Sequence, residues 1–263
     1  MSSHRTGARR ICDVPKPLLA ALEAGQLSSA THAEHMAIDQ RSLWRAAFPE
    51  LAHLANAFDG LPFIARLRRG GELLVDAYGE LAWRVEPHES DMVRAWRAFA
   101  VGAAPALELR RRLELMRPFA VDSHFAVREW AWLSARPHVC AEPHETLSAL
   151  TAATGSANPH WRRFATEVTR PRSVWGKHIA TFKADPAPAE QLLVPLLGDH
   201  DLAVITSVTN WLNDVCQWQP AWVASMCRLV PAGAPRSPDW FLGRATRGLR
   251  QAPPKRARMS AAT

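Results

Sequence analysis

Four segments of this chain share a polar start followed by an amphipathic helical pattern, and they recur at a nearly regular interval. They begin near Ser123, Pro159, Asp201 and Asp239. Equivalent apolar positions lie about 34, 43 and 38 residues apart, in the range of helical-pair repeats, at Val127, Trp161, Val204 and Leu242. We therefore predict an all-α fold, a superhelical stack of HEAT-like helix pairs whose second helices line a concave surface.

The composition also favours helix over strand. Ala, Leu and Arg are abundant, whereas the chain has a single Tyr and only 13 Gly. The 20 Pro fall mostly between apolar periodic segments, where they separate helices. Alternation with period two is nowhere long enough to predict a sheet. Partner helices are expected over residues 145–153 and 189–197.

We expect one domain with unstructured ends. Residues 1–14 are predicted to be a disordered basic N-terminus and 251–263 a disordered basic tail. A single HEAT-like domain is predicted over 15–250, with an N-terminal helical part (15–105) and the repeats that carry the site (106–250). In the N-terminal part we predict helices over 15–25 and 31–48, a break at Gly70-Gly71, and a helix capped by Ser90-Asp91.

The formal net charge of +7 indicates an anionic partner, of which nucleic acid is the commonest, although a merely soluble basic protein would also fit. Four widely spaced cysteines indicate no disulfide framework, and no segment is apolar enough to predict a membrane span, so we expect a cytoplasmic protein. His138, Cys140 and His144 form a metal-like cluster without a second pair, so we predict a surface turn and no metal.

The densest chemistry lies between His160 and Trp175. This stretch contains four arginines, one carboxylate and two indoles: Arg162, Arg163, Arg170, Arg172, Glu167, Trp161 and Trp175. Arginines this close together repel each other unless an anion neutralises them, and one carboxylate is not enough. Planar cations interleaved with aromatic rings suit a phosphate backbone with a sugar or base nearby.

Three blocks of the sequence resemble the HEAT-like alkylpurine DNA glycosylases, the AlkC branch more than the AlkD branch. Glu167-Val-Thr-Arg-Pro-Arg-Ser-Val-Trp175 is similar to that family's S-E-G-x-R-P-R-L-P-W block. Ser207-Val-Thr-Asn-Trp-Leu-Asn-Asp-Val215 is similar to its S-V-A-N-H-L-N-D-I block. His124-Phe-Ala-Val-Arg128 is similar to its E-F-A-I-R block. Weaker similarity extends the resemblance over most of the chain.

The resemblance implies hydrolysis of the N-glycosidic bond of a cationic alkylated base, such as 3-methyladenine, in duplex DNA without base flipping. It places Glu167, Trp175 and Asp214 in the site. An alkylated purine is already cationic, so its departure needs no general acid. A carboxylate can stabilise the oxocarbenium-like sugar or orient the attacking water, and an indole can stabilise a developing cation. No cofactor is implied.

The chain also departs from the family pattern. His124 stands where the family has a carboxylate of its active site, and Ser173-Val174 replace the L-P before the tryptophan. The immunoglobulin-like C-terminal module of some family members has no counterpart in this sequence. Because neutral imidazole supplies no negative charge, we expect His124 to orient water or contact a phosphate, with reduced or altered activity.

The candidate DNA contacts are ten polar side chains: Arg128, Arg162, Arg163, Arg170, Arg172, Lys177, Asn210, Asn213, Arg244 and Arg247. About half of the cations are expected to lie on solvated helix faces instead. Asn210 has an equally good alternative as a brace between repeats, and Asp214 as a structural residue. Glu167 has the alternative of an ion pair with Arg163 or Arg170 at helical spacing, and Trp175 that of core packing.

The sequence therefore predicts a monomeric DNA glycosylase of base excision repair that acts on duplex DNA with alkylated bases. The main alternative is a non-catalytic HEAT-repeat protein that binds branched or damaged DNA through the same groove. A scaffold that binds an acidic protein is the third hypothesis. The glycosylase is favoured over the scaffold because a protein scaffold has no need of Arg-Pro-Arg beside Trp and Glu.

Overall fold

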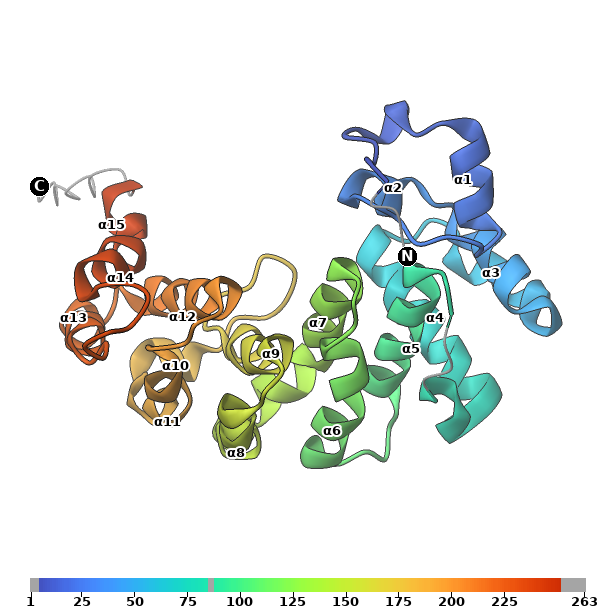
Figure 1. Ribbon diagram of the computed structural model, residues 1–263. Helices are drawn as coiled ribbons and strands as arrows, with labels where there is room; N and C mark the ends of the chain where they lie inside the picture. Colours follow the sequence, from blue (N-terminus) through green and yellow to red (C-terminus); the bar gives the residue numbers. More distant parts are fainter. Residues whose placement is uncertain (1–4, 85–87, 252–263) are drawn as a thin grey trace, which may run out of the picture. The chain divides into compact units, whose positions relative to one another are not determined.

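The computed structural model describes residues 5–84 and 88–251, and every regular element in these ranges is a helix (Figure 1). The prediction of an all-α fold is therefore confirmed. The predicted basic tail lies almost entirely outside the described residues. Within the described ranges, no helix combines the length and apolar character needed to cross a membrane.

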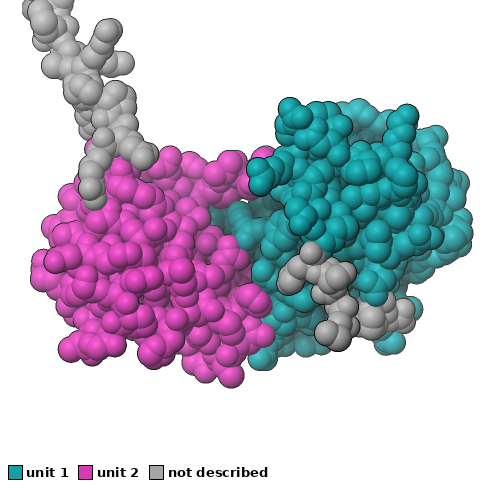
Figure 2. Space-filling view, turned by 45° about the horizontal axis from the view of Figure 1, so that its top comes forward, with its two compact units in different colours: residues 1–142 teal, residues 143–263 magenta. Residues whose placement is uncertain are grey.

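The chain divides into two compact units, residues 1–142 and 143–263, and the single HEAT-like domain over residues 15–250 stays a prediction (Figure 2). The predicted subdivision near residue 105 does not coincide with this boundary. The reason is that α5 (Asp91–Ala103) packs against both α6 (Leu109–Ala120) and α7 (Phe125–Ala141), which join the helices on either side of residue 105 in one unit.

Unit 1 is built around a core of large aromatic side chains. Its first four helices are α1 (Lys16–Glu23), α2 (His32–Ala37), α3 (Gln40–Ala47) and α4 (Phe63–Tyr78), followed by α5, α6 and α7. Short 3-10 helices span Ile11–Asp13, Pro49–Phe58 and Gly79–Trp83. Trp44 and Trp96 are fully buried, with ring centroids 5.3 Å apart. Burial of such rings removes a large apolar area from water and so stabilises unit 1.

Two predicted boundaries in unit 1 differ from the structure. The helix predicted over 31–48 is broken at Ile38, because the Asp39 side chain accepts a hydrogen bond from the Arg41 backbone and starts a new helix. Residues 5–14, expected to be disordered, lie against the buried Glu34. Its carboxylate binds Arg5 Nη1 at 2.6 Å and the Ala8 backbone nitrogen at 2.9 Å.

The predicted break at Gly70-Gly71 is wrong, since α4 continues through both residues. The glycines serve close packing of α4 against α5 instead. A Cβ atom on Gly71 would lie 2.5 Å from the carbonyl carbon of Phe99 and 2.7 Å from the nitrogen of Ala100. Backbone atoms cannot move aside as the end of a flexible side chain can. The absence of a side chain at Gly71 therefore allows α4 and α5 to approach each other closely.

We expect Gly71→Ala to lower the free energy of unfolding of unit 1 by about 1–3 kcal/mol, because overpacking forces the two helices apart. Thermal and denaturant unfolding measure this change. Gly155→Ala is the matched control, because a Cβ atom there meets nothing within 4 Å. Equal effects of the two substitutions would contradict the close-packing explanation.

Unit 2 contains the helices α8 (Pro143–Leu150), α9 (Pro159–Thr169), α10 (Ala180–Ala184), α11 (Glu190–Leu193), α12 (Leu202–Val215), α13 (Pro220–Arg228), α14 (Pro238–Ala245) and α15 (Arg247–Gln251). The helix α12 packs against α9 on one side and α14 on the other (Figure 1). The four recurring segments all coincide with helix starts. Each of these helices is preceded by a side chain that accepts a backbone hydrogen bond, namely His124, Asn158, Asp201 and Ser237.

Candidate functional site

Two predicted catalytic carboxylates come together in unit 2 because of how α9 packs against α12. Glu167 lies in the last turn of α9 and Asp214 in the last turn of α12. The two helices are joined by a hydrogen bond between the hydroxyls of Thr166 and Ser207 at 2.6 Å. The indole of the buried Trp211 donates to the Thr169 carbonyl oxygen at 3.2 Å. This packing sets the two helix ends side by side.

Arg170, the residue directly after α9, links the two carboxylates. Its Nε and Nη2 atoms bind the two oxygens of Asp214 at 2.9 and 3.2 Å. Its Nη1 atom donates to Glu167 Oε2 at 3.2 Å. Arg163, one turn earlier on α9, lies 3.6 Å from Glu167 Oε1. We call Glu167, Arg170 and Asp214 the carboxylate clamp.

The carboxylate clamp is largely withdrawn from solvent. Glu167 is 6% exposed and Asp214 is 4% exposed. Burial alone would lower the pKa of Arg170, but its hydrogen bonds to Asp214 and the charges of Glu167 and Asp214 raise this pKa well above its ordinary value. The guanidinium is thus held charged between the two carboxyl groups. The cluster can present negative charge at the surface of unit 2, but Arg170 offsets part of it.

Trp175 lies on the connection between α9, which ends at Thr169, and α10, which begins at Ala180. A hydrogen bond from the Ile179 nitrogen to the Pro171 carbonyl oxygen at 3.0 Å joins the two ends of this connection. The Ser173 hydroxyl accepts hydrogen bonds from the backbone of Trp175 and Gly176 at 3.3 and 3.0 Å. Trp175 is 53% exposed, so the alternative of core packing does not hold. The same connection carries two exposed cations, Arg172 and Lys177.

Four of the predicted DNA contacts brace α12 against the C-terminal helices. Arg247 Nη2 donates to Asn210 Oδ1 at 2.6 Å, and the Gly248 nitrogen donates to Asn213 Oδ1 at 3.0 Å. Arg244 Nε donates to the Thr209 hydroxyl at 3.3 Å. These contacts match the alternative in which Asn210 braces neighbouring repeats. Burial, together with the positive charges of Arg244 and Arg170, lowers the pKa of Arg247, so cations are crowded here.

Two further arginines among the predicted DNA contacts are used inside the protein. Arg162 pairs with Asp199 at 2.6 Å and donates to the Ser156 carbonyl oxygen at 2.7 Å. Arg128, in unit 1, donates to the carbonyl oxygens of Asp122 and Ser123 at 2.6 and 2.8 Å, directly before α7. These bonds tie helix starts to preceding loops. Both arginines therefore have a structural role in the absence of DNA.

His124 lies in unit 1, where it caps α7 and contacts a buried polar cluster. Its Nε2 atom donates to the Ser29 carbonyl oxygen at 2.6 Å, and its Nδ1 atom accepts from the Ala126 nitrogen at 3.3 Å. The same Nδ1 atom lies 3.6 Å from Asp91, whose carboxylate is fully buried. Both ring nitrogens thus have partners within unit 1, which favours a structural role for His124.

We expect His124→Glu to destabilise unit 1 without increasing base release. A carboxylate at this position would face the Ser29 carbonyl oxygen and the buried Asp91, so it would be repelled from both. Thermal unfolding and release of methylated base from DNA measure the two effects. His124→Gln is the control, because an amide keeps a donor for Ser29. A gain of activity in the Glu variant alone would show that a missing carboxylate limits this protein.

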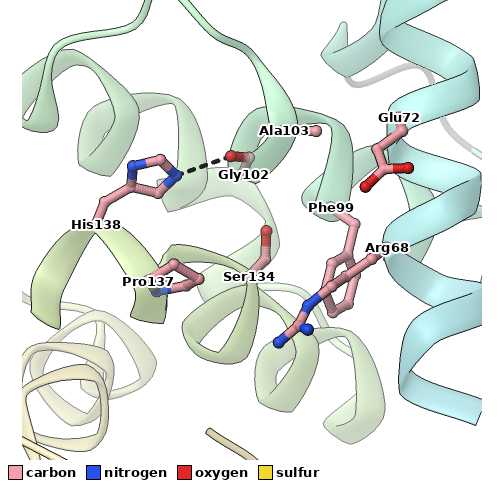
Figure 3. Close-up of a pocket in the computed structure, with 8 residues that line it drawn as sticks. All are labelled: Arg68, Glu72, Phe99, Gly102, Ala103, Ser134, Pro137 and His138. Carbon is pink, nitrogen blue, oxygen red and sulfur yellow. Dashed lines mark hydrogen bonds between the residues drawn. The ribbon is translucent and has the colours of Figure 1, made fainter. Parts of the chain in front are cut away.

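A pocket in unit 1 contains none of the predicted site residues (Figure 3). It lies between α4, α5 and α7, and His138 Nε2 donates to the Gly102 carbonyl oxygen at 2.8 Å on its wall. The surface turn predicted for His138, Cys140 and His144 is wrong, because His138 and Cys140 lie within α7 and His144 lies in α8. Among the described residues, no group of three or more His, Cys, Asp or Glu side chains is arranged to hold a metal ion.

The alternative of an ion pair between Glu167 and Arg163 or Arg170 agrees with the structure, but the sequence did not predict the second partner of Arg170. Its spacing of three from Glu167 was a visible signal for an ion pair with that residue. Its bidentate contact with Asp214, 44 residues away, had no signal in the sequence because it depends on how α9 and α12 pack.

Comparisons with known proteins support the fold. No protein-family model matches the chain. The alkylpurine DNA glycosylase AlkC of Pseudomonas fluorescens, solved bound to DNA containing an abasic site analogue, is similar with a TM-score of 0.62. The sequences are 24% identical, and the similarity covers 88% of this chain and 64% of AlkC. The predicted HEAT-like, AlkC-like resemblance is thereby confirmed at the level of the fold.

A second relative is the uncharacterized protein YhaZ of Bacillus subtilis. The two sequences are 34% identical over 116 residues, which is 44% of this chain and 32% of YhaZ. The matched region spans about a third of YhaZ and less than two thirds of AlkC. An activity of either whole protein can thus come to this chain only as a proposal.

Proposed function

We propose that this protein is a DNA glycosylase that hydrolyses the N-glycosidic bond of cationic alkylated bases in duplex DNA and acts as a monomer. One observation carries the proposal. Glu167 and Asp214, from two neighbouring helices of unit 2, lie close together in an arginine-rich part of the chain. A HEAT-like fold similar to that of a DNA-bound alkylpurine glycosylase supports it.

In the proposed reaction the base leaves as a neutral purine, because alkylation has already made it cationic. The carboxylate clamp stabilises the positive charge that develops on the deoxyribose. One of the two acids orients and deprotonates the attacking water, and the exposed indole of Trp175 stabilises the cation through its π face. No step requires a metal or an organic cofactor.

Contacts with the phosphate backbone come in this proposal from cations of unit 2. Arg172 and Lys177 are exposed beside Trp175, and Arg244 and Arg247 lie at the C-terminal end. Arg163 and Arg170 remain bound to the acids and contribute charge rather than new hydrogen bonds. Binding is therefore expected to weaken steeply as salt rises.

The direct test is incubation of the protein with methylated duplex DNA, followed by measurement of free 3-methyladenine and of abasic sites. We expect both products in equal amount. Heat-treated protein, which is unfolded, gives the background of spontaneous depurination. Tight binding of the duplex without release of base above that background would contradict the proposal.

A second function is favoured by a specific observation, namely that Arg170 binds both carboxylates and offsets part of their negative charge, and that His124 supplies no negative charge. On this alternative the protein is a non-catalytic relative that binds branched or damaged DNA. It predicts tighter binding to a DNA junction or to DNA with an abasic site than to an intact duplex, and no base release.

A further inference from the structure

The C-terminal end of unit 2 is strongly biased in charge. Between residues 228 and 250 the chain has a single carboxylate, Asp239, and five arginines: Arg228, Arg236, Arg244, Arg247 and Arg250. Like charges at this density repel each other unless an anion binds between them. This stretch therefore contains more than half of the chain's net charge of +7 and points to an anionic ligand.

Two of these arginines lie over one aromatic ring. The Cζ atom of Arg236 lies 5.4 Å from the ring centroid of Trp240, and that of Arg244 lies 5.1 Å from it. The three residues are spaced by four along the chain, in and just before α14. Cation–π attraction at such distances holds a guanidinium in place without using its N–H donors. We call Arg236, Trp240 and Arg244 the α14 platform.

The α14 platform is fixed to the core of unit 2 but remains accessible. The ring of Trp240 lies edge-on to that of the fully buried Phe241, with centroids 5.4 Å apart. Arg244 is oriented by its hydrogen bond to Thr209 of α12. Arg236 is exposed, and within the described residues it forms no ion pair. The platform thus presents oriented cations and a partly exposed indole on a rigid support.

We propose that the α14 platform is a binding site for the sugar–phosphate backbone of nucleic acid. A phosphodiester would accept hydrogen bonds from the guanidiniums of Arg236 and Arg244, and the deoxyribose would lie against Trp240. The inference rests on the proposed DNA-binding function and adds a contact at residues other than the carboxylate clamp. Neither Arg236 nor Trp240 was among the contacts predicted from the sequence.

Nucleic acid fits this site better than an acidic polypeptide does. Carboxylates of a polypeptide would satisfy the guanidiniums but leave the indole without a flat partner. A nucleic-acid backbone places a sugar or base beside each phosphate, so the cations and the ring are used together. Burial and, after it, the charges of Arg244 and Arg170 lower the pKa of Arg247, so neighbouring cations add to an excess of positive charge that a phosphate would relieve.

The test measures the affinity of the full chain for an undamaged duplex as a function of salt, by fluorescence anisotropy. The variants are Arg236→Ala and Trp240→Ala, and the matched control is Arg228→Ala, which removes an exposed arginine that is not part of the platform. Losing one phosphate contact should reduce the slope of log affinity against log salt by about 0.9. By the same relation it should weaken binding roughly eightfold at about 0.1 M salt.

We expect this loss for Arg236→Ala, at least as large a loss for Trp240→Ala, and a nearly unchanged slope for Arg228→Ala. Trp240→Phe keeps a ring beneath the arginines, so it should bind better than Trp240→Ala. Comparing the two variants distinguishes loss of the ring contact from unfolding of the Trp240→Ala protein. Equal effects of Arg228→Ala and Arg236→Ala would overturn the proposal, because they would indicate diffuse charge. Poly-glutamate that binds as tightly as the duplex and loses affinity equally with Trp240→Ala would also overturn it.

The outcome is independent of the proposed catalysis, because undamaged DNA is used. If the platform variants weaken binding and the wild-type protein releases no methylated base, the platform stands and the glycosylase proposal fails. If the wild-type protein releases base and no platform variant changes the salt slope, the glycosylase proposal stands and the platform proposal fails.

Discussion

Replacing Asp214 with Asn, or Glu167 with Gln, is expected to lower the release of 3-methyladenine from methylated duplex DNA by about 100-fold or more. The amides have nearly the same shape but no negative charge, so they cannot offset the charge that develops on the sugar. The substitutions also remove ion pairs of Arg170 and so lower the free energy of unfolding of unit 2. Single-turnover assays at temperatures below unfolding separate the two effects.

Asp201→Asn is the matched control for these substitutions. Asp201 caps the start of α12, the helix that ends with Asp214, and its side chain accepts from the Ala203 nitrogen at 2.8 Å. An asparagine caps a helix equally well, so neither stability nor base release should change. Trp175→Ala should lower base release without lowering stability, because the indole that stabilises the cation is exposed and can be removed without leaving a cavity. Full activity of both amide variants would place the reacting charge elsewhere.

The second large effect is expected in unit 1, where Asp91→Asn should lower the free energy of unfolding by about 3 kcal/mol or more. One Asp91 oxygen accepts from the Ser29 nitrogen at 2.9 Å, and the other accepts from the Ser29 hydroxyl at 2.6 Å and from His35 Nδ1 at 2.7 Å. Trp130 donates to His35 Nε2 at 2.8 Å, which fixes the proton of His35 on Nδ1. Either orientation of an amide therefore sets two buried donors against each other.

Acid should weaken unit 1 through the same cluster. Burial alone would raise the pKa of Asp91, but the hydrogen bonds that its carboxylate accepts from His35 and from the Ser29 hydroxyl lower it well below its ordinary value. A lowered pKa in the folded state means that this contribution to stability is fully present above the unfolded pKa of about 4. It is lost as pH falls below that value toward the folded pKa.

The melting temperature of unit 1 between about pH 5 and pH 2 measures this contribution. The wild-type protein should lose stability across this range, whereas Asp91→Asn should start lower and lose less. Asp76→Asn is the comparison for a carboxylate of unit 1 on the exposed side of α4. Parallel curves for the wild-type protein and Asp91→Asn would show that Asp91 contributes no pH dependence.

Several elements could be predicted because their signals are local. The starts of α5, α9 and α12 could be predicted from neighbouring residues, namely the Ser90 cap, the proline after Asn158, and Asp201. Gly70-Gly71 was misread for the same reason. Glycine pairs usually interrupt helices, and only the approach of α5 shows why this pair lies inside one.

The order of polar and apolar residues along this chain was sufficient to determine helices, their starts and their repetition, because each depends on side chains within a turn or two. It also brought arginines, acids and indoles into the same repeats. Which of these groups meet was decided by tertiary packing. Arg170 reaches Asp214 as well as Glu167 only because α9 and α12 bring their ends together. Arg236, Trp240 and Arg244, by contrast, lie at spacings of four in one segment, so their contact is local. Contacts between groups on separate helices depend on crossing geometry and side-chain direction, which leave no periodic trace in a sequence.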